Sequence, residues 1–286
     1  MKILLTGASG QVGYELERSL QALGEVVAVD RARMDLSDLD QVRDVVRQVR
    51  PSLIVNPAAY TAVDKAESEP ELAHRINALA PGVMAAEARV LGAAMVHYST
   101  DYVFNGAKPG AYAETDATNP INVYGHSKLA GEQAIAAAGI PHLILRTSWV
   151  YGMRGKNFLL TMLRLARERD ELRVVADQHG APTWSRTIAD TSAAILAQAR
   201  SGGPQWWETH SGIYHLSGQG QTTWHGFTEA IVAAAGLECR VLPIPSADYP
   251  VPARRPVNSV MTSEKLISSF CNLPHWDTAL KLCLAS

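Results

Sequence analysis

The chain has 286 residues, of which 47% are hydrophobic and 19% are charged, so its composition is that of an ordinary globular protein and excludes a disordered or fibrous chain. The 26 basic and 28 acidic side chains leave a formal net charge of −2, and no basic tract favours a nucleic acid or membrane partner. Cys239, Cys271 and Cys283 include no CxxC pair, which argues against a disulfide framework and for a reducing compartment.

No apolar stretch is long enough to suggest a membrane span, and the apolar run at residues 3–5 is too short for a secretory signal. We therefore expect a cytoplasmic protein that does not enter a membrane.

The first half of the chain predicts strands that alternate with helices. Apolar runs typical of buried parallel strands lie at residues 3–6, 26–29, 53–55, 93–98, 143–145 and 173–175. Apolar residues recur at helical spacing over residues 11–23, 37–49 and 70–91, with Ser37 as the expected cap of the second helix and Pro70 in the first turn of the third. This alternation predicts right-handed βαβ units and a parallel sheet covered on both faces.

The last third of the chain differs, because several prolines gather between Pro204 and Pro256. We expect an α/β fold: a Rossmann-like doubly wound parallel sheet with a smaller carboxyl-terminal substrate lobe. The dinucleotide-binding domain is expected at residues 1–148, completed by a strand and a helix at 171–200. Residues 149–170 and 201–286 are expected to form the lobe. Ligands of such sheets bind beyond the carboxyl ends of the strands.

Three glycines, Gly7, Gly10 and Gly13, form a G-x-x-G-x-x-G turn between the first strand and the first helix. Such a turn lets the backbone approach a pyrophosphate at the amino terminus of the helix, although a tight turn without a ligand has the same spacing. Asp30 closes the second strand, where a carboxylate suits ribose hydroxyls. Arg31 and Arg33 follow and suit a 2′-phosphate, so the choice between NAD and NADP stays open. Asp35 and Leu36 are expected near the adenine.

Tyr124 and Lys128 are four residues apart at the start of a predicted helix, so they share one helix face. A nearby ammonium favours the phenolate, and we expect it to lower the Tyr124 pKa for proton transfer. A surface pair on a helix is the alternative. Thr100 follows the fourth strand, where its hydroxyl can bond the carbonyl oxygen that Tyr124 protonates. Asn77 suits either a proton relay or a satisfied buried amide.

These motifs resemble the extended short-chain dehydrogenase/reductase superfamily over about the first half of the chain. Longer stretches resemble one family within it, the dTDP-4-dehydrorhamnose reductases, and they extend into the last lobe. They lie at residues 6–13, 59–67, 97–104, 122–125, 146–151, 177–183 and 253–256.

The resemblance implies roles for single residues. Contacts to NADPH or NADH are implied for Gly10, Gln11, Val12, Asp30, Asp35, Leu36, Ala59, Tyr60 and Thr61, beside Gly7, Gly13, Arg31, Tyr124 and Lys128 from the motifs. Thr100 and Asp101 would contact the sugar, and Trp149 would pack against its ring. Arg254 and Arg255 would meet the nucleotide diphosphate. A core role for Trp149 and surface ion pairs for the arginines are the alternatives, and His97 and His126 are expected to be structural.

The activity that the resemblance implies is reduction of the C4 ketone of dTDP-4-dehydro-L-rhamnose to dTDP-L-rhamnose, a precursor of cell-surface polysaccharides. Tyr124 would donate the proton, Lys128 would hold the ribose, and Thr100 would position the oxygen. Two alternatives remain open: a non-catalytic regulatory subunit like that of methionine adenosyltransferase, and a reductase or epimerase of another nucleotide sugar.

Some family members are linked to a magnesium ion at a dimer contact. Glu15 could supply one carboxylate, but Arg186 lies where a second acid is needed, and the nine histidines show no ligand spacing. We expect no metal, a small-molecule nucleotide-sugar partner, no nucleic acid, and a possible homodimer.

Overall fold

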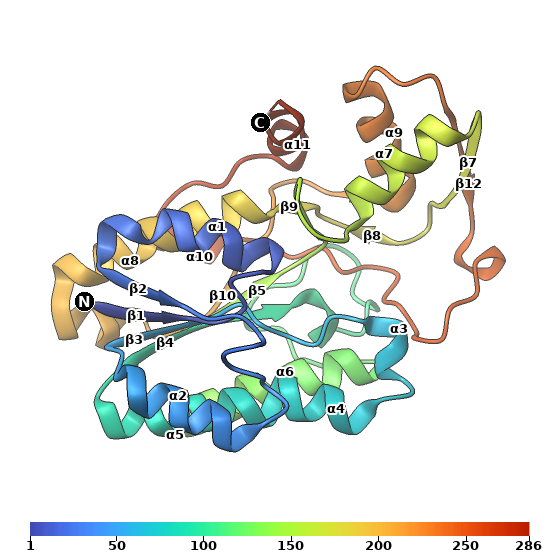
Figure 1. The fold of residues 1–286 in the computed structure, drawn as a ribbon. Coiled ribbons are helices and arrows are strands. Elements are labelled where there is room, and N and C mark those ends of the chain that lie inside the picture. Colours follow the sequence, from blue (N-terminus) through green and yellow to red (C-terminus); the bar gives the residue numbers. More distant parts are fainter. Residues whose placement is uncertain (286) are drawn as a thin grey trace.

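A six-stranded parallel sheet forms the centre of the computed structural model, which describes residues 1–285 (Figure 1). Across the sheet the strands are β10 (Gly212–His215), β5 (His142–Thr147), β4 (Ala94–Thr100), β3 (Leu53–Asn56), β1 (Lys2–Leu5) and β2 (Glu25–Ala28). All neighbouring strands run parallel. This arrangement confirms the predicted Rossmann-like sheet. The chain order reverses between β1 and β3, and a crevice for a ligand is expected at the carboxyl ends of these two strands.

Helices cover both faces of the sheet (Figure 1). One face carries α1 (Gln11–Ser19), α8 (Ser185–His210) and α10 (Glu264–Ser269), and the other carries α2 (Leu39–Val49), α4 (Pro70–His74), α5 (Ala80–Leu91) and α6 (Val123–Ala137). Each layer has its own core, with Leu16 and Ile188 on the first side and Val42 and Met84 on the second. Because both faces are covered, every residue of β3 and β4 is buried, which explains the apolar runs that begin each strand, and the polar residues come at their carboxyl halves.

The predicted helix at 70–91 has a π-helical turn at Arg75–Leu79, which joins α4 to α5. Pro70 lies in the first turn of α4, as predicted. The predicted helix at 11–23 ends earlier, because α1 stops at Ser19 and a short 3₁₀ turn, Gln21–Leu23, follows.

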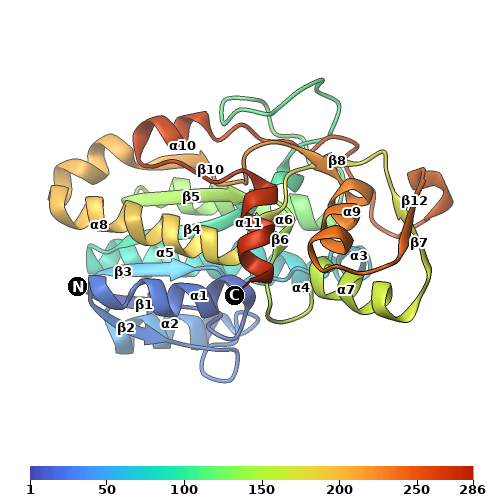
Figure 2. The same cartoon turned by 90° about the horizontal axis from the view of Figure 1, so that it is seen from above.

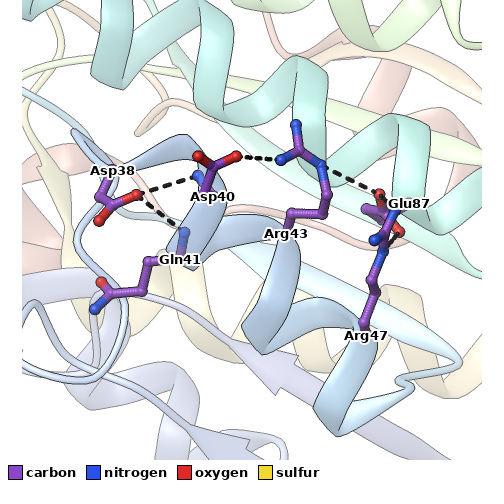
Figure 3. Close-up of polar contacts among 6 residues, drawn as sticks. All are labelled: Asp38, Asp40, Gln41, Arg43, Arg47 and Glu87. Carbon is purple, nitrogen blue, oxygen red and sulfur yellow. Dashed lines mark hydrogen bonds and ion pairs between the residues drawn. The ribbon is translucent and has the colours of Figure 1, made fainter.

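The amino-terminal cap of α2 is Asp38, so the prediction of Ser37 was wrong. An Asp38 carboxylate oxygen accepts hydrogen bonds from the backbone N–H groups of Asp40 and Gln41 (Figure 3). Ser37 instead donates its hydroxyl to Asp35 at 2.7 Å. Figure 3 also shows how α2 is tied to α5, because Arg47 makes a bidentate pair with Glu87 at 2.9 Å for both contacts.

A smaller lobe lies beyond the carboxyl ends of the strands (Figures 1 and 2). Its helices are α7 (Phe158–Glu168), α9 (Trp224–Ala234) and α11 (Trp276–Leu284), and its strand pairs are β7 (Glu171–Val175) with β12 (Arg240–Ile244), β6 (Val150–Tyr151) with β9 (Thr183–Trp184), and β8 (His179–Gly180) with β11 (Thr222–Thr223). Tyr151, Leu163 and Phe227 belong to its core. The short helix α3 (Val63–Ala66) faces this lobe from the side of the sheet (Figure 1).

One predicted strand belongs elsewhere. The strand expected at 173–175 was assigned to the main sheet, but β7 pairs with β12 in the lobe. The sixth strand of the main sheet is β10, which pairs with β5 and lies within the segment assigned to the lobe. The helix expected to complete the domain, α8, does pack on the sheet beside α1. Among residues 1–285, no helix has the length and apolar character needed to cross a membrane.

Candidate active site

A cavity of about 530 Å³ opens at the carboxyl ends of β1, β3 and β4. Its walls contain every residue predicted to contact the dinucleotide except Asp30 and Arg33: Gly7, Gly10, Gln11, Val12, Gly13, Arg31, Asp35, Leu36, Ala59, Tyr60, Thr61, Tyr124 and Lys128. The structure thus brings together segments that are more than a hundred residues apart in the sequence, at the sheet edge where ligands of this fold bind.

The glycine turn leads directly into α1. Gly7 has a positive φ of 57°, and a Cβ on Gly13 would lie 2.1 Å from the Gly7 carbonyl oxygen, so this close turn requires glycine at both positions. Gly10 is the N-cap of α1 and has no side chain to satisfy the first N–H groups. Those groups and the positive end of the helix dipole therefore remain available to an anion such as a pyrophosphate.

The residues after β2 form one side of the cavity. Ser37 donates its backbone N–H and hydroxyl to Asp35, and Arg31 pairs with the same carboxylate at 3.1 Å, which together lower the pKa of Asp35. Asp30 is exposed and outside the cavity wall, and its carboxylate accepts from the N–H groups of Ala32 and Arg33 in its own turn. A dinucleotide role for Asp30 stays a prediction.

Asn77 holds the loop that contains Tyr60. Its side chain accepts from the Tyr60 N–H at 2.8 Å and donates to the Tyr60 carbonyl at 3.0 Å and to Ser127 at 2.9 Å. Asn77 is buried in the π-helical turn between α4 and α5. Of the two sequence-based alternatives, the contacts match a satisfied buried amide, which fixes the cavity wall to α6.

Tyr124, Thr100 and Asp101 form a compact polar group above the end of β4. Thr100 donates to the Asp101 carboxylate at 3.0 Å, and its hydroxyl lies close enough to the Tyr124 phenol to influence the pKa of that phenol. Burial raises the pKa of Tyr124 above its ordinary value, and the Thr100 contact opposes this rise. The expectation of a lowered Tyr124 pKa was therefore wrong. Burial also raises the pKa of Asp101 to about 6.

Lys128 lies one helical turn after Tyr124, and its ammonium points back toward β4. It donates to the Tyr98 carbonyl at 2.7 Å and lies 3.2 Å from Nε2 of His97. Burial lowers the pKa of Lys128 to about 8, and the charge of Glu132, one turn further along α6, opposes this. An ammonium has three N–H groups, so these two contacts leave one for a ligand in the cavity.

Trp149 has one face of its indole covered. It stacks on Trp224 with ring centroids 3.5 Å apart, and the indole lies so close to Gly180 that a Cβ there would be 2.4 Å from it. Its backbone has a φ of 46°, a strained value for a residue other than glycine. Trp149 is absent from the wall of this cavity, so its contact with a sugar stays a prediction.

A second cavity of about 760 Å³ lies between the lobe and α3. Its walls combine apolar side chains such as Met162, Leu165 and Trp224 with charged side chains of both signs, namely Arg169, Arg173 and Arg255 and the acids Asp64, Glu171 and Asp248. Arg255 pairs with Asp64 of α3 at 2.7 Å and donates to the Tyr102 hydroxyl at 3.3 Å. Arg254 is exposed and outside both walls, and its carbonyl accepts from Asn122, the N-cap of α6. The two predicted arginines are therefore in different environments.

Sequence reasoning missed several residues of these walls. Ser99 and Thr147 line the first cavity, and their buried hydroxyls have no hydrogen-bond partner within residues 1–285. Both residues could have been predicted from their positions at the ends of β4 and β5, because parallel strands end at the same edge of the sheet. Trp224 of the second cavity had no comparable signal. Among the described residues, no three His, Cys, Asp or Glu side chains gather as metal ligands.

Comparison with known proteins identifies relatives over the whole chain. A family model described as "RmlD substrate binding domain" matches residues 1–286. The dTDP-4-dehydrorhamnose reductase of Burkholderia thailandensis is 52% identical over 99% of this chain and 98% of its own, and that of Escherichia coli K12 is 47% identical over 99% and 97%. The crystal structure of a Bacillus anthracis dTDP-4-dehydrorhamnose reductase in complex with NADP superimposes with a TM-score of 0.91 at 36% identity, covering 99% of this chain and 98% of that one.

Proposed function

The chain belongs to the family of the RmlD substrate binding domain, and from this membership we propose that it reduces the C4 ketone of dTDP-4-dehydro-L-rhamnose to dTDP-L-rhamnose with NADPH or NADH. Two relatives that bear the name of this reductase are 52% and 47% identical to almost the entire chain. The observation that carries the proposal is the first cavity, in which Tyr124 and Lys128 meet the glycine turn and the amino terminus of α1.

The residues of the first cavity fit a nicotinamide dinucleotide. The uncapped amino terminus of α1 suits the pyrophosphate, and Arg31 with Asp35 suits the adenosine end. Lys128 would hold ribose hydroxyls through its remaining N–H group. When bound, the cofactor supplies the hydride. The presence of both Asp35 and Arg31 leaves the preference between NADH and NADPH open.

The chain's own residues supply the proton and the orientation. Tyr124 donates its phenolic proton to the oxygen of the reduced ketone, and its raised pKa keeps that proton in place until negative charge develops on the oxygen. Thr100, whose hydroxyl lies beside the Tyr124 phenol, would turn that hydroxyl from Asp101 to the same oxygen when the substrate is bound. The second cavity would take the nucleotide of the substrate, because apolar walls suit a base and guanidinium groups suit a diphosphate.

The test is product analysis with dTDP-4-dehydro-L-rhamnose, with NADH and NADPH in parallel. Cofactor absorbance should fall, and dTDP-L-rhamnose should be identified by mass and chromatographic retention. A regulatory subunit would bind the dinucleotide without consuming it. A reductase or epimerase of another nucleotide sugar would act faster on UDP- or GDP-linked substrates in the same assay.

The same proposal includes a cytoplasmic location, a possible homodimer, and a role in supplying a precursor for lipopolysaccharide O antigen. Light scattering of the purified protein tests the assembly. Deletion of the gene should remove rhamnose from the cell-surface polysaccharide of the source organism.

A further inference from the structure

A buried row of polar side chains leads from Lys128 into the core of the sheet. The proposed reaction uses Lys128 but none of the other members of this row. Thr6 donates its hydroxyl to the Asn56 amide oxygen at 2.6 Å, the Asn56 amide nitrogen lies 3.0 Å from Nδ1 of His97, and Nε2 of His97 lies 3.2 Å from the Lys128 amine. No side chain of the four is more than 1% exposed. This row of side chains crosses from the end of β1 through β3 and β4 to α6. Of its members, only Lys128 lines the first cavity.

The charge on His97 is settled by its surroundings. Burial and the nearby charge of Lys128 hold the pKa of His97 well below its ordinary value, so the ring is neutral. A neutral imidazole has one N–H donor and one lone-pair acceptor. The two ring nitrogens must therefore play opposite roles toward Asn56 and Lys128.

Two hydrogen-bond patterns can connect the four side chains, and the second has the Asn56 atoms placed as they are in the structure. When Lys128 is charged it only donates, so Nε2 accepts, Nδ1–H donates to the Asn56 oxygen, and the Asn56 amide donates to Thr6. When Lys128 is neutral, its lone pair accepts from Nε2–H, the Asn56 amide donates to Nδ1, and the Thr6 hydroxyl donates to the Asn56 oxygen. A charged ammonium facing Nε2–H, or Nδ1–H facing the Asn56 amide nitrogen, would place two donors face to face, which is costly in a buried site.

We propose that His97 is a positioning residue for Lys128, and that its two tautomers, together with the orientation of the Asn56 amide, accommodate both protonation states of the lysine amine. The other groups around Lys128 do not exchange roles in this way. The Tyr98 carbonyl only accepts, Tyr124 lies one turn back on α6, and Glu132 is engaged in a buried pair with Arg146 at 2.7 Å.

This inference deepens the proposed function. The effect of His97 on cofactor binding rests on that function, whereas the exchange of tautomers does not. Lys128 is proposed to hold the cofactor ribose next to Tyr124, so its orientation affects cofactor affinity. Its charge affects the pH range of binding and turnover. A neutral partner that can accept from the ammonium keeps the charged form available in a closed core.

The first experiment needs neither substrate nor cofactor. Nitrogen NMR of protein labelled with ¹⁵N-histidine distinguishes the two tautomers of each ring, and the spectrum of His97→Gln identifies the His97 signals. His97 should pass from the Nδ1–H form to the Nε2–H form as the pH rises through about 8, where Lys128 loses its proton. In Lys128→Met this transition should be absent. A single His97 tautomer at all pH values, or the same transition in both proteins, would overturn the inference whatever the enzyme reduces.

The second experiment measures NADPH affinity against pH by cofactor fluorescence. His97→Leu removes the acceptor of the Lys128 ammonium, so it should weaken binding about tenfold near neutral pH and move the pH dependence about one unit lower. His97→Gln, whose amide oxygen can accept, should recover part of both effects.

The matched control is His215→Leu. His215 is equally buried, in strand β10, and its ring contacts the Thr262 carbonyl rather than Lys128. This variant should lose stability with no change in the pH dependence of NADPH binding. If His97→Leu behaves in the same way, His97 is only a core residue and the inference fails.

Discussion

Tyr124 is the side chain on which the proposed proton transfer depends. Tyr124→Phe removes the phenolic hydroxyl and its contact with Thr100 while keeping the ring and its edge-to-face packing against Tyr102. Turnover should fall about 10²- to 10⁴-fold because the general acid is lost, and dinucleotide affinity should change little. Steady-state kinetics and fluorescence titration with NADPH measure the two quantities.

Tyr214→Phe is a control for loss of a buried hydroxyl. The Tyr214 hydroxyl donates to the His210 carbonyl at 3.0 Å, outside both cavities, so this variant should keep its turnover. Turnover of Tyr124→Phe within a few-fold of the unmodified protein would remove Tyr124 from the role of general acid.

Asp101 carries a cost in stability that depends on pH. Burial raises its pKa to about 6 from an ordinary value of 3.8, so between these values the folded protein binds more protons than the unfolded one. Stability contributed by this group therefore falls as the pH rises through that window and stays low above it. Asp101→Asn should stabilise the fold by roughly 1–3 kcal/mol at pH 8, and the gain should vanish below about pH 4.

Urea denaturation at several pH values checks this sign. Asp116→Asn is the contrasting variant, because a hydrogen bond from Lys108 lowers the pKa of Asp116, and its loss should not stabilise the fold at any pH. A gain for Asp101→Asn that is equal at acidic and alkaline pH would show that the carboxyl charge is not the cause.

For single residues, the sequence predicted which side chains lie in the site better than it predicted their pKa values and surroundings. The glycine spacing and the residues after the strands located part of the first cavity, because parallel strands end at a common edge, and the family resemblance added Gln11, Val12 and residues 59–61. The pKa of Tyr124 was predicted in the wrong direction, since spacing along a helix shows which residues are neighbours and not how deeply they are buried. The sequence also could not predict the surroundings of Trp149, because Gly180 and Trp224 come from distant parts of the chain.

Among the elements, α2 gives a direct test of helix capping. Asp38→Ala removes the acceptor of two backbone N–H groups, so it should lower the free energy of unfolding by about 0.5–2 kcal/mol. Ser37→Ala, at the residue first predicted as the cap, should cost less, because it loses only a contact with Asp35. Chemical denaturation of both variants gives the comparison, and a larger loss for Ser37→Ala would contradict the assignment of Asp38 as the cap.

The assignment of strands shows where periodicity stops being informative. An apolar run identifies residues 173–175 as a strand, yet nothing local determines which sheet it joins, and β7 pairs in the lobe. The strand that does complete the main sheet, β10, contains Gly212 and His215 between polar and glycine-rich segments, so it did not stand out in the sequence. Its pairing with β5 is determined by long-range packing against α10 and the core of the first helical layer.

Across the whole molecule, the chain passes between the sheet and the lobe more than once. After β5 it enters the lobe through β6, α7 and β7, returns to the sheet through α8 and β10, and then re-enters the lobe through α9 and β12 (Figures 1 and 2). The expected division, with residues 171–200 returning to the sheet, anticipated such crossings but assigned β7 to the sheet and β10 to the lobe. The consequence for function is that one cavity lies at the strand ends while the other has walls from both parts of the chain.

Arg255 tests whether the two cavities bind different ligands, the dinucleotide in the first and the nucleotide sugar in the second. It comes from the carboxyl-terminal segment and pairs with Asp64 of α3 at the wall of the second cavity. Arg255→Gln removes that guanidinium, and the KM for the nucleotide sugar should rise about 10- to 100-fold because a diphosphate loses a charged partner. Dinucleotide affinity should stay within about threefold, since the first cavity does not include Arg255. Arg254→Gln is the matched control, as its exposed side chain lies outside both walls. Equal effects of the two substitutions would show that general positive charge near the cavity, rather than the placement of Arg255, attracts the substrate.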